Sequence, residues 1–232
     1  MAIPTPSQLR SLRKRDPRLG KAMRSLPKFP GFPEADAPRG TRYESLARAI
    51  VFQQLAYKAA DTIHARACAL TPGSRFPKPL EVLALPEESL RGAGLSRAKL
   101  AAVRDLASHI QDGRLHLASI HHHDDATVIG RLTAVRGIGV WTAQMFLIFH
   151  LGRLDVLPSG DLGVQEGLRL LDGLEQRPTP KELEARGAVW SPMSSVASWM
   201  LYRVVDEVAE KKALAKVAEV KVNAKAGKKK RG

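Results

Sequence analysis

Residues 132–143 read Leu-Thr-Ala-Val-Arg-Gly-Ile-Gly-Val-Trp-Thr-Ala, and this stretch decides the fold. Two patterns of helical spacing flank a Gly137-Ile-Gly139 turn, where the glycines let the backbone reverse and approach another surface closely. The second helix begins directly after the turn, so its first backbone N–H groups form a site suited to an anion. Such a hairpin can hold a DNA phosphate without reading base sequence. A Gly-x-Gly turn alone is a weak signal, whereas the longer string with Thr-Ala after it is far more specific.

A second stretch, residues 151–163, places one carboxylate at the start of a helix. It reads Leu-Gly-Arg-Leu-Asp-Val-Leu-Pro-Ser-Gly-Asp-Leu-Gly, so a helix ends near Gly152 and an extended turn passes through Pro158. Asp161 then precedes apolar residues at helical spacing, which are Val164, Leu168 and Leu171. An ordinary N-cap explains Asp161 equally well from this local sequence. Its interpretation therefore depends on the rest of the chain.

The remaining sequence carries helix signals and no convincing alternating strand pattern. We expect a short basic helix around residues 7–26, followed by a proline-rich linker, residues 27–40, that prevents regular helix. Further helix starts are predicted where Thr or Ser precedes an apolar pattern, at Thr41, Ser96, Thr179 and Ser191. The run from Thr41 is expected to continue as one long helix to Pro72-Gly73. The chain is therefore predicted to be all-α.

Composition limits the classes of site that the chain can form. With 232 residues, of which 44% are hydrophobic, it can bury one sizeable core or two small helical lobes. The single cysteine, Cys68, excludes an intrachain disulfide and any four-cysteine iron–sulfur or zinc site, and is expected to be a buried thiol. No run of 18 apolar residues occurs, and the basic N-terminus lacks the apolar core of a secretory leader. We expect a cytoplasmic protein with no membrane partner.

Charge indicates a polyanionic partner. The formal net charge is +14, and residues 211–232 supply +8 of it through nine Lys or Arg and one Glu. We expect this tail to be disordered and yet to increase affinity for DNA at low salt through nonspecific attraction to phosphates. Charge alone does not separate DNA from RNA or from acidic membranes.

The hairpin and the Asp161 stretch, in their order and spacing, resemble the helix-hairpin-helix GPD superfamily of DNA base-excision glycosylases, in particular its 3-methyladenine DNA glycosylase II branch. The likeness spans about residues 43–207 and includes Ile50-Val-Phe-Gln53-Gln54, the Gly137-Ile-Gly139 hairpin and Pro158-x-x-Asp161. It implies a two-lobed helical bundle with a cleft between the lobes. Bacterial type II enzymes typically add an N-terminal β-containing domain, for which this chain lacks strands.

We divide the chain accordingly into four parts. Residues 1–40 form the N-terminal helix and linker, which pack on the C-terminal lobe. Residues 41–150 form the central lobe with the hairpin, and residues 151–210 complete the cleft. Residues 211–232 are the basic tail.

The resemblance implies DNA contacts made largely by the backbone. The N–H groups expected to bind a phosphate just 3′ of the lesion belong to Gly137, Gly139 and Thr142. The carbonyl groups matching those that hold a monovalent cation in relatives belong to Thr133, Val135 and Ile138, so a structural Na⁺ or K⁺ is expected there, with no cofactor required for the reaction. The helix end expected to contact DNA contains Gln53, Gln54 and Leu55, of which Gln54 or Leu55 is the wedge that fills the gap left by a flipped nucleotide.

The residue type at position 141 distinguishes the bifunctional from the monofunctional members of the family. Bifunctional members carry a lysine immediately before Thr-Ala, which forms a Schiff base with the sugar. Trp141 occupies that position here, so the resemblance implies a monofunctional enzyme. Its ring is our candidate for the face that attracts a cationic base, with a packed core position as the alternative. Met145 and Met193 stand where relatives often carry aromatics, which predicts a wider, more adaptable base pocket.

The implied reaction is hydrolysis of the N-glycosidic bond of an alkylated purine, of the 3-methyladenine or 7-methylguanine type, in double-stranded DNA. Asp161 matches the family's catalytic aspartate, and an ionised carboxylate there stabilises positive charge developing on deoxyribose. Asp155 is expected to have a structural role in orienting the loop before Asp161. Two alternatives stay open, a noncatalytic helix-hairpin-helix DNA-binding protein and a glycosylase for other damaged bases. We expect a monomer, associated with the nucleoid if the source is bacterial.

Overall fold

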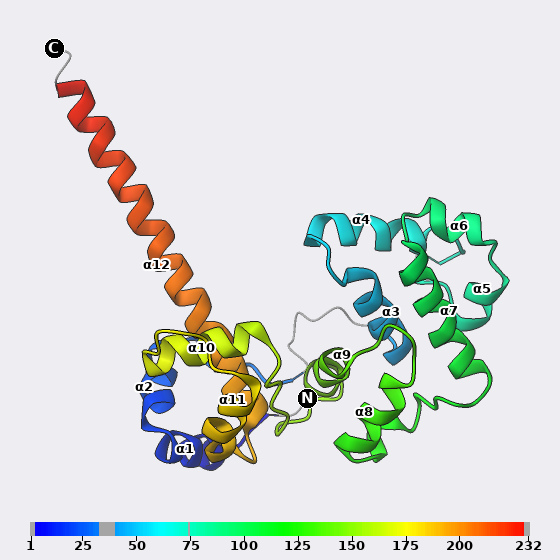
Figure 1. The fold of residues 1–232 in the computed structure, drawn as a ribbon, viewed down its shortest axis with the longest axis horizontal. Coiled ribbons are helices and arrows are strands. Elements are labelled where there is room, and N and C mark those ends of the chain that lie inside the picture. The colour runs from blue at the N-terminus through cyan, green and yellow to red at the C-terminus, as the bar shows by residue number, and fades with distance from the viewer. Residues whose placement is uncertain (1–2, 33–39, 74, 230–232) are drawn as a thin grey trace. The chain divides into compact units, whose positions relative to one another are not determined.

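The computed structural model describes residues 3–32, 40–73 and 75–229, and these form helices and helical turns with no β-strand (Figure 1). The all-α fold predicted from the sequence is confirmed. The chain divides into two compact units: unit 1 contains Gly31–Arg153, and unit 2 contains Ile3–Pro30 together with the chain from Leu154 onward. No helix in the described ranges is long and apolar enough to cross a membrane.

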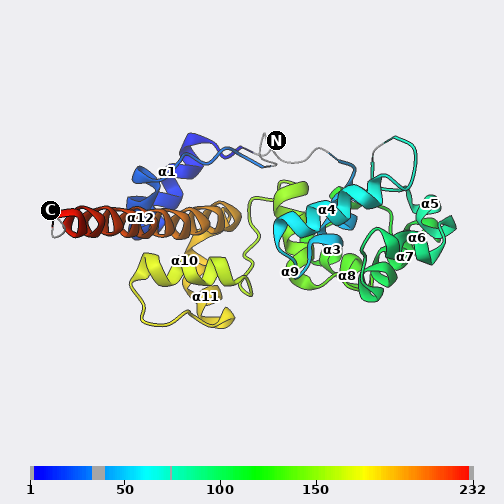
Figure 2. The same ribbon diagram turned by 90° about the horizontal axis from the view of Figure 1, so that it is seen from above.

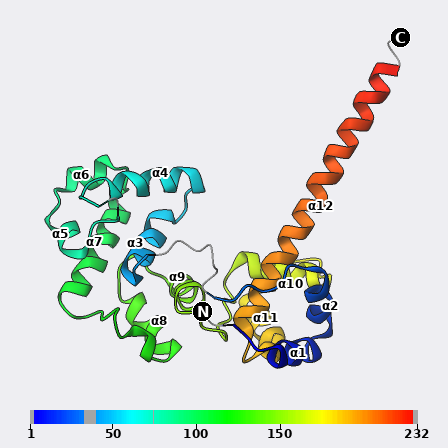
Figure 3. The ribbon, with the colours of Figure 1, turned by 180° about the vertical axis from the view of Figure 1, so that it is seen from behind.

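Unit 1 contains the helices from α3 to α9 and two short turns (Figures 1 and 3). Their bounds are α3 (Arg42–Phe52), α4 (Tyr57–Cys68), α5 (Pro79–Ala84), α6 (Glu87–Gly92), α7 (Arg97–Gln111), η1 (Ile120–His122), α8 (Asp125–Thr133), α9 (Val140–Met145) and η2 (Phe146–His150), the last a π-helical turn. α7 packs against α3, α5 and α6, and α8 packs against α9. Fully buried aliphatic side chains form the core, among them Leu46, Ile50, Val103, Leu106 and Leu132.

Capping residues set helix starts in unit 1 as predicted. The Thr41 hydroxyl accepts the N–H of Glu44 while the Glu44 carboxylate accepts the N–H of Thr41, and Ser96 caps α7 by accepting the N–H of Lys99. The expectation of one long helix from Thr41 to Pro72 is wrong. Gln54 adopts a φ of 54°, a left-handed conformation that cannot continue a right-handed helix, so α3 ends at Phe52 and α4 begins at Tyr57.

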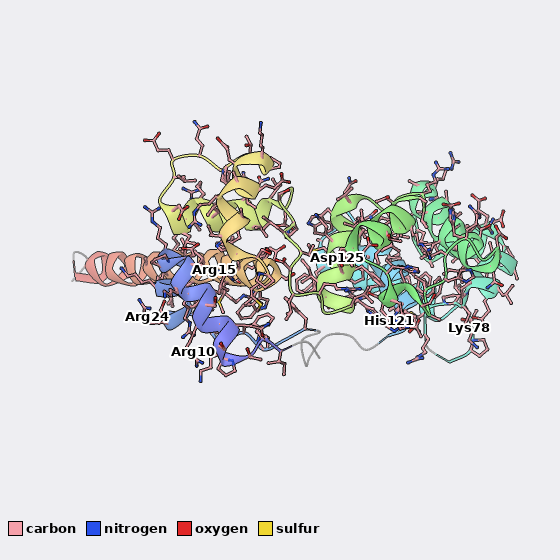
Figure 4. All side chains as sticks on the ribbon, turned by 90° about the horizontal axis from the view of Figure 1, so that it is seen from below. Arg10, Arg15, Arg24, Lys78, His121 and Asp125 are labelled. Carbon is pink, nitrogen blue, oxygen red and sulfur yellow. The ribbon has the colours of Figure 1, made fainter. Side chains whose placement is uncertain are left out.

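Unit 2 combines both ends of the chain (Figure 2). Its elements are α1 (Pro6–Arg15), α2 (Pro17–Ser25), α10 (Leu162–Asp172), α11 (Pro180–Gly187), η3 (Ala188–Trp190) and α12 (Ser194–Lys229). The single helix expected over residues 7–26 is two helices, because Asp16 is extended and Pro17 begins a new helix that Asp16 caps. α1 contacts η3, and α2 contacts α10 and α12. In Figure 4 the labelled Arg10, Arg15 and Arg24 extend from this N-terminal pair.

The last helix departs from two expectations. α12 begins at Ser194 rather than at Ser191-Pro192, and it continues to Lys229, through most of the tail expected to be disordered. Alanine and lysine favour helix, which is consistent with the extension, and the Lys211 ammonium lies 2.9 Å from the Glu207 carboxylate one turn earlier, where the tail begins. Residues 230–232 of the predicted tail and 33–39 of the predicted linker lie outside the described residues.

Candidate active site

Asp161 is both a helix cap and a buried carboxylate. In unit 2 its Oδ1 accepts the N–H of Val164 at 2.9 Å as the N-cap of α10, and only 6% of the residue is exposed. The turn before it is closed by the Asp161 N–H, which donates to the Pro158 carbonyl at 2.9 Å. The positive end of α10 attracts the negative charge of the side chain. Local geometry thus fixes a buried carboxyl group at the start of α10.

Polar contacts hold the loop that leads to Asp161. The Gln165 amide donates to the Ser159 carbonyl at 2.8 Å, and the Ser159 hydroxyl donates to the Glu184 carboxylate at 2.6 Å. Asp155, expected to orient this loop, accepts bonds from the Ser191 hydroxyl at 2.7 Å and the Ser194 N–H at 3.1 Å. Burial tends to raise the pKa of Asp155, but these hydrogen bonds outweigh it and hold the pKa below its usual range. Asp155 therefore anchors the loop to the start of α12.

The hairpin in unit 1 owes its shape to glycine and to a neighbouring helix. Gly137 has a φ of 80°, and a Cβ atom there would lie 2.8 Å from the Cβ of Ala102 on α7, so only glycine fits. The Gln53 amide donates to the Gly137 carbonyl at 2.9 Å. Gly139 is the N-cap of α9 and has no side chain that could accept a hydrogen bond from the N–H groups of the first turn. Thr142 carries one of these N–H groups.

The three residues whose carbonyl groups are expected to hold a cation, Thr133, Val135 and Ile138, line one open hollow. The Val135 carbonyl accepts the N–H of Ile138 at 3.1 Å, which leaves its second lone pair for a ligand. The Asp105 carboxylate borders the same hollow and accepts the Arg136 N–H at 2.7 Å. Arg114 and Arg136 also line the hollow, so Asp105 offsets only part of the positive charge there. The fit to a hard monovalent cation therefore rests on the carbonyl oxygens, which are the donors that such an ion takes.

Apolar side chains are exposed around the hairpin and the α3–α4 turn of unit 1. Leu55 is 40% exposed and Trp141 is 49% exposed. A packed core position for Trp141, the alternative raised from sequence, is therefore wrong. Large apolar residues that face solvent are suited to contact a partner rather than the protein core.

The residues predicted to form the base pocket fall in both units. Met145, with Thr142, lines a cavity of about 390 Å³ in unit 1, which also includes Ala49 and Phe149. Trp141 does not line this cavity. Met193 belongs to unit 2, where it is 1% exposed and its N–H donates to the Trp190 carbonyl at 2.8 Å. Sequence reasoning thus missed most of the lining of the cavity.

Phenylalanine and histidine rings line this cavity beside the charged residues Glu44, Arg48 and Arg75. Burial lowers the pKa of His64, with a further contribution from the Arg48 guanidinium, and burial likewise lowers the pKa of His150. His150 stacks on Phe146 with ring centroids 5.0 Å apart. Burial and the Glu44 carboxylate raise the pKa of the Cys68 thiol, which is buried as expected. The lowered pKa values favour neutral imidazoles at neutral pH, so the positive charge along this cavity comes from Arg48 and Arg75 and is countered by Glu44.

Comparison with known proteins assigns the chain to a family. Residues 47–193 match the family described as HhH-GPD superfamily base excision DNA repair protein. The chain belongs to this superfamily, as the resemblance predicted. It is 33% identical over 162 residues to DNA-3-methyladenine glycosylase 1 of Schizosaccharomyces pombe, covering 69% of this chain and 71% of that protein.

Two solved structures share the fold over most of the chain. A DNA-3-methyladenine glycosidase from Bacillus halodurans superposes with a TM-score of 0.80 at 34% identity, covering 90% of this chain and 94% of that one. A 3-methyladenine DNA glycosylase from Schizosaccharomyces pombe, in complex with abasic DNA, gives a TM-score of 0.75 at 29% identity, covering 84% and 95%.

Proposed function

We propose that this protein is a monofunctional DNA glycosylase that hydrolyses the N-glycosidic bond of alkylated purines during base excision repair. The observation that carries the proposal is Asp161, a buried carboxylate that caps α10 in a member of this family. The residue immediately before Thr142 is Trp141, which has no amine to form a Schiff base with the sugar. Water is therefore the acceptor of the glycosyl group.

The reaction uses one carboxylate. The damaged nucleotide rotates out of the duplex, at a cost of about a few kcal/mol. As the bond to the base breaks, positive charge develops on deoxyribose, and ionised Asp161 stabilises that charge and orients or deprotonates the attacking water. A cationic base such as 3-methyladenine departs neutral, so no acid is needed to protonate it.

In this proposal the hairpin binds the phosphate backbone of the DNA. The N–H groups of Gly137, Gly139 and Thr142 bind a phosphate beside the lesion. Na⁺ or K⁺ held by the carbonyls of Thr133, Val135 and Ile138 would add positive charge next to that phosphate. Because the side-chain amide of Gln53 bonds to the Gly137 carbonyl, we assign Gln53 the role of supporting the hairpin. The residue that fills the gap left by the flipped nucleotide is then Gln54 or Leu55. The partner is double-stranded DNA, and the acting species is a monomer in the cytoplasm or on the nucleoid.

Two features of unit 1 support alkylated purines as substrates, the exposed ring of Trp141 and the cavity that Met145 lines. The exposed ring of Trp141 offers a face to a cationic base, an attraction of about 0.5 to 2 kcal/mol. Met145, on the cavity wall of unit 1, is a flexible side chain that accepts bases of differing outline. The expected substrates are of the 3-methyladenine and 7-methylguanine type.

Replacement of Asp161 tests the proposal. Asp161→Asn should lower base release from methylated duplex DNA by at least about 100-fold while leaving the Kd for DNA nearly unchanged. The matched control is Asp124→Asn, because Asp124 caps α8 in the same way, with its Oδ1 accepting the Thr127 N–H at 2.8 Å. That variant should keep wild-type activity.

Two results would overturn the proposal. Near wild-type release by Asp161→Asn would remove the catalytic role. DNA binding by the wild type without release of any base from a panel containing 3-methyladenine, 7-methylguanine, ethenoadenine, hypoxanthine and 8-oxoguanine would favour the noncatalytic alternative. Release of 8-oxoguanine alone would instead identify a glycosylase for oxidised bases.

A further inference from the structure

Two glycines allow α12 to pack directly on α10 in unit 2 (Figure 2). A Cβ atom at Gly167 would lie 2.5 Å from the carbonyl oxygen of Leu201, and one at Gly163 would lie 2.8 Å from Cε1 of Tyr202. Both distances are well inside van der Waals contact, so no side chain fits at either position. The glycines therefore bring the Tyr202 ring onto the first turn of α10.

That turn begins with Asp161. The Cβ position at Gly163 is also 3.1 Å from Asp161 Oδ1, so the tyrosine ring and the carboxylate border the same small space. The Tyr202 hydroxyl donates a hydrogen bond to the Asp161 carboxylate. Burial, followed by the negative charge of Asp161, raises the pKa of Tyr202 well above its usual range. The hydroxyl therefore keeps its proton at neutral pH and acts as a donor to the carboxylate.

We infer that Tyr202 is a positioning residue that holds the Asp161 carboxylate in the orientation needed for base release. The inference rests on the proposed function of Asp161. The carboxylate has donors from two helices, the Val164 N–H of α10 at 2.9 Å and the Tyr202 hydroxyl of α12. Together they restrict rotation of the carboxylate, while a carboxylate has enough lone pairs to accept a water as well. A reacting group that is displaced from its productive position slows a reaction strongly. Holding the Asp161 carboxylate in one orientation therefore contributes to the rate of base release.

A purely structural role for the buried hydroxyl is the competing explanation, and the chain offers a matched control. Tyr43 in unit 1 is 8% exposed, and its hydroxyl donates to the Pro77 carbonyl at 2.9 Å. Loss of either hydroxyl removes one buried hydrogen bond and leaves the ring in place. Of these two tyrosine hydroxyls, the one that bonds to Asp161 is that of Tyr202, so the loss of the Tyr202 hydroxyl should change the rate of the chemical step and the loss of the Tyr43 hydroxyl should not.

The experiment compares Tyr202→Phe, Tyr43→Phe and the wild type in single-turnover release of 7-methylguanine from duplex DNA, well below the Tm of each. Tyr202→Phe should lower the rate at saturating enzyme by about 10-fold or more, the range expected for a hydrogen bond to a charged group. Its Kd for the DNA, measured by fluorescence anisotropy, should change by less than about 2-fold. Tyr43→Phe should release the base at the wild-type rate.

A second variant, at Gly163 of α10, tests the contact between the Tyr202 ring and the first turn of α10. Gly163→Ala adds a methyl group 2.8 Å from the Tyr202 ring and 3.1 Å from Asp161 Oδ1, and should slow base release because it displaces the ring and the carboxylate from each other. The double variant Gly163→Ala with Tyr202→Phe should lose less than the product of the two single effects, since both act on one contact.

The results separate the two proposals. If Asp161→Asn releases base normally, the proposed function fails and Tyr202 has nothing to position. If Asp161→Asn is inactive but Tyr202→Phe matches the wild type, only the inference about Tyr202 fails. If Tyr202→Phe and Tyr43→Phe slow base release equally, and each in proportion to its loss in Tm, the Tyr202 hydroxyl has a structural role. That result would also overturn the inference.

Discussion

The side-chain amide of Gln53 donates a hydrogen bond to the main-chain carbonyl of Gly137 across 2.9 Å, although the two residues are 84 positions apart in sequence. The bond joins the end of α3 to the turn of the hairpin. On its other side the turn lies against Ala102 of α7, where a Cβ on Gly137 would be only 2.8 Å away. The hairpin is therefore held by contacts from two helices remote in sequence.

Gln53→Ala should loosen the hairpin and weaken DNA binding. The Gly137 carbonyl loses its donor, and a net loss of about 1 kcal/mol corresponds to a Kd about 5-fold higher. Fluorescence anisotropy with undamaged duplex DNA measures this directly. Gln176→Ala, at an exposed position in unit 2, is the control and should bind as the wild type does. A Kd unchanged by Gln53→Ala would show that the hairpin keeps its shape without the bond.

The parts of the fold that local chemistry determines can be predicted from sequence. Thr41, Ser96 and Thr179 cap helices because their hydroxyl groups bond to an N–H three residues later. Asp161 caps α10 for the same reason. The hairpin turn is predictable because Gly137 supplies a positive φ that few other residues adopt.

Contacts between distant segments are not predictable in this way. Gln54 has a left-handed conformation without being glycine, so nothing in its residue type marks the end of α3. The hydrogen bond from Tyr202 to Asp161 depends on how α12 crosses α10, which sequence spacing does not specify. One signal was present: Gly163 and Gly167, four residues apart in a helical pattern, indicate a face against which another helix packs closely.

Met145→Tyr should narrow the range of bases released. Met145 lines the cavity of about 390 Å³ in unit 1, and a rigid ring there reduces the space for a base. Release of ethenoadenine, which is larger, should fall by about 10-fold relative to 3-methyladenine, a difference of about 1.4 kcal/mol in transition-state stabilisation. Competition assays with both lesions in equal amounts measure the ratio. An unchanged ratio would exclude Met145 from contact with the base.

Asp16→Ala should destabilise unit 2. Asp16 is 2% exposed, and its carboxylate accepts the Trp190 indole N–H at 2.7 Å and the Leu19 N–H at 3.0 Å while lying 2.9 Å from Arg186. Removing the carboxylate leaves the N–H groups of Trp190 and Leu19 buried without an acceptor, at a cost of about 2 to 4 kcal/mol in the free energy of unfolding, while Arg186 keeps its ion pair with Asp172. Urea denaturation measures the loss. The control Asp112→Ala removes an exposed carboxylate paired with Arg114 and should leave stability almost unchanged.

The same carboxylate makes stability depend on pH. Burial tends to raise the pKa of Asp16, but hydrogen bonds from Leu19 and Trp190, together with Arg186, outweigh it and hold the pKa below its usual range. Because the pKa is lower in the folded state, the stabilisation is present above the unfolded pKa of about 3.9 and is lost as pH falls through the folded pKa. The difference in unfolding free energy between the wild type and Asp16→Asn should therefore be constant near neutral pH and shrink below about pH 4. A difference as large at pH 3 as at pH 7 would contradict this.

Removal of residues 211–232 should weaken DNA binding mainly at low salt. The segment carries nine Lys or Arg against one Glu, so its removal takes away charge that attracts phosphates and releases counterions. The slope of log Kd against log salt concentration should become shallower by about 0.9 for each phosphate that the tail neutralises in the wild type, with no change in the rate of base release at saturating enzyme. Because α12 continues to Lys229, truncation also shortens a helix, and a full-length variant with glutamine at every tail lysine separates the two effects. If that variant keeps the wild-type slope while the truncation does not, the helix rather than its charge binds the DNA, and electrostatic tethering by the tail is wrong.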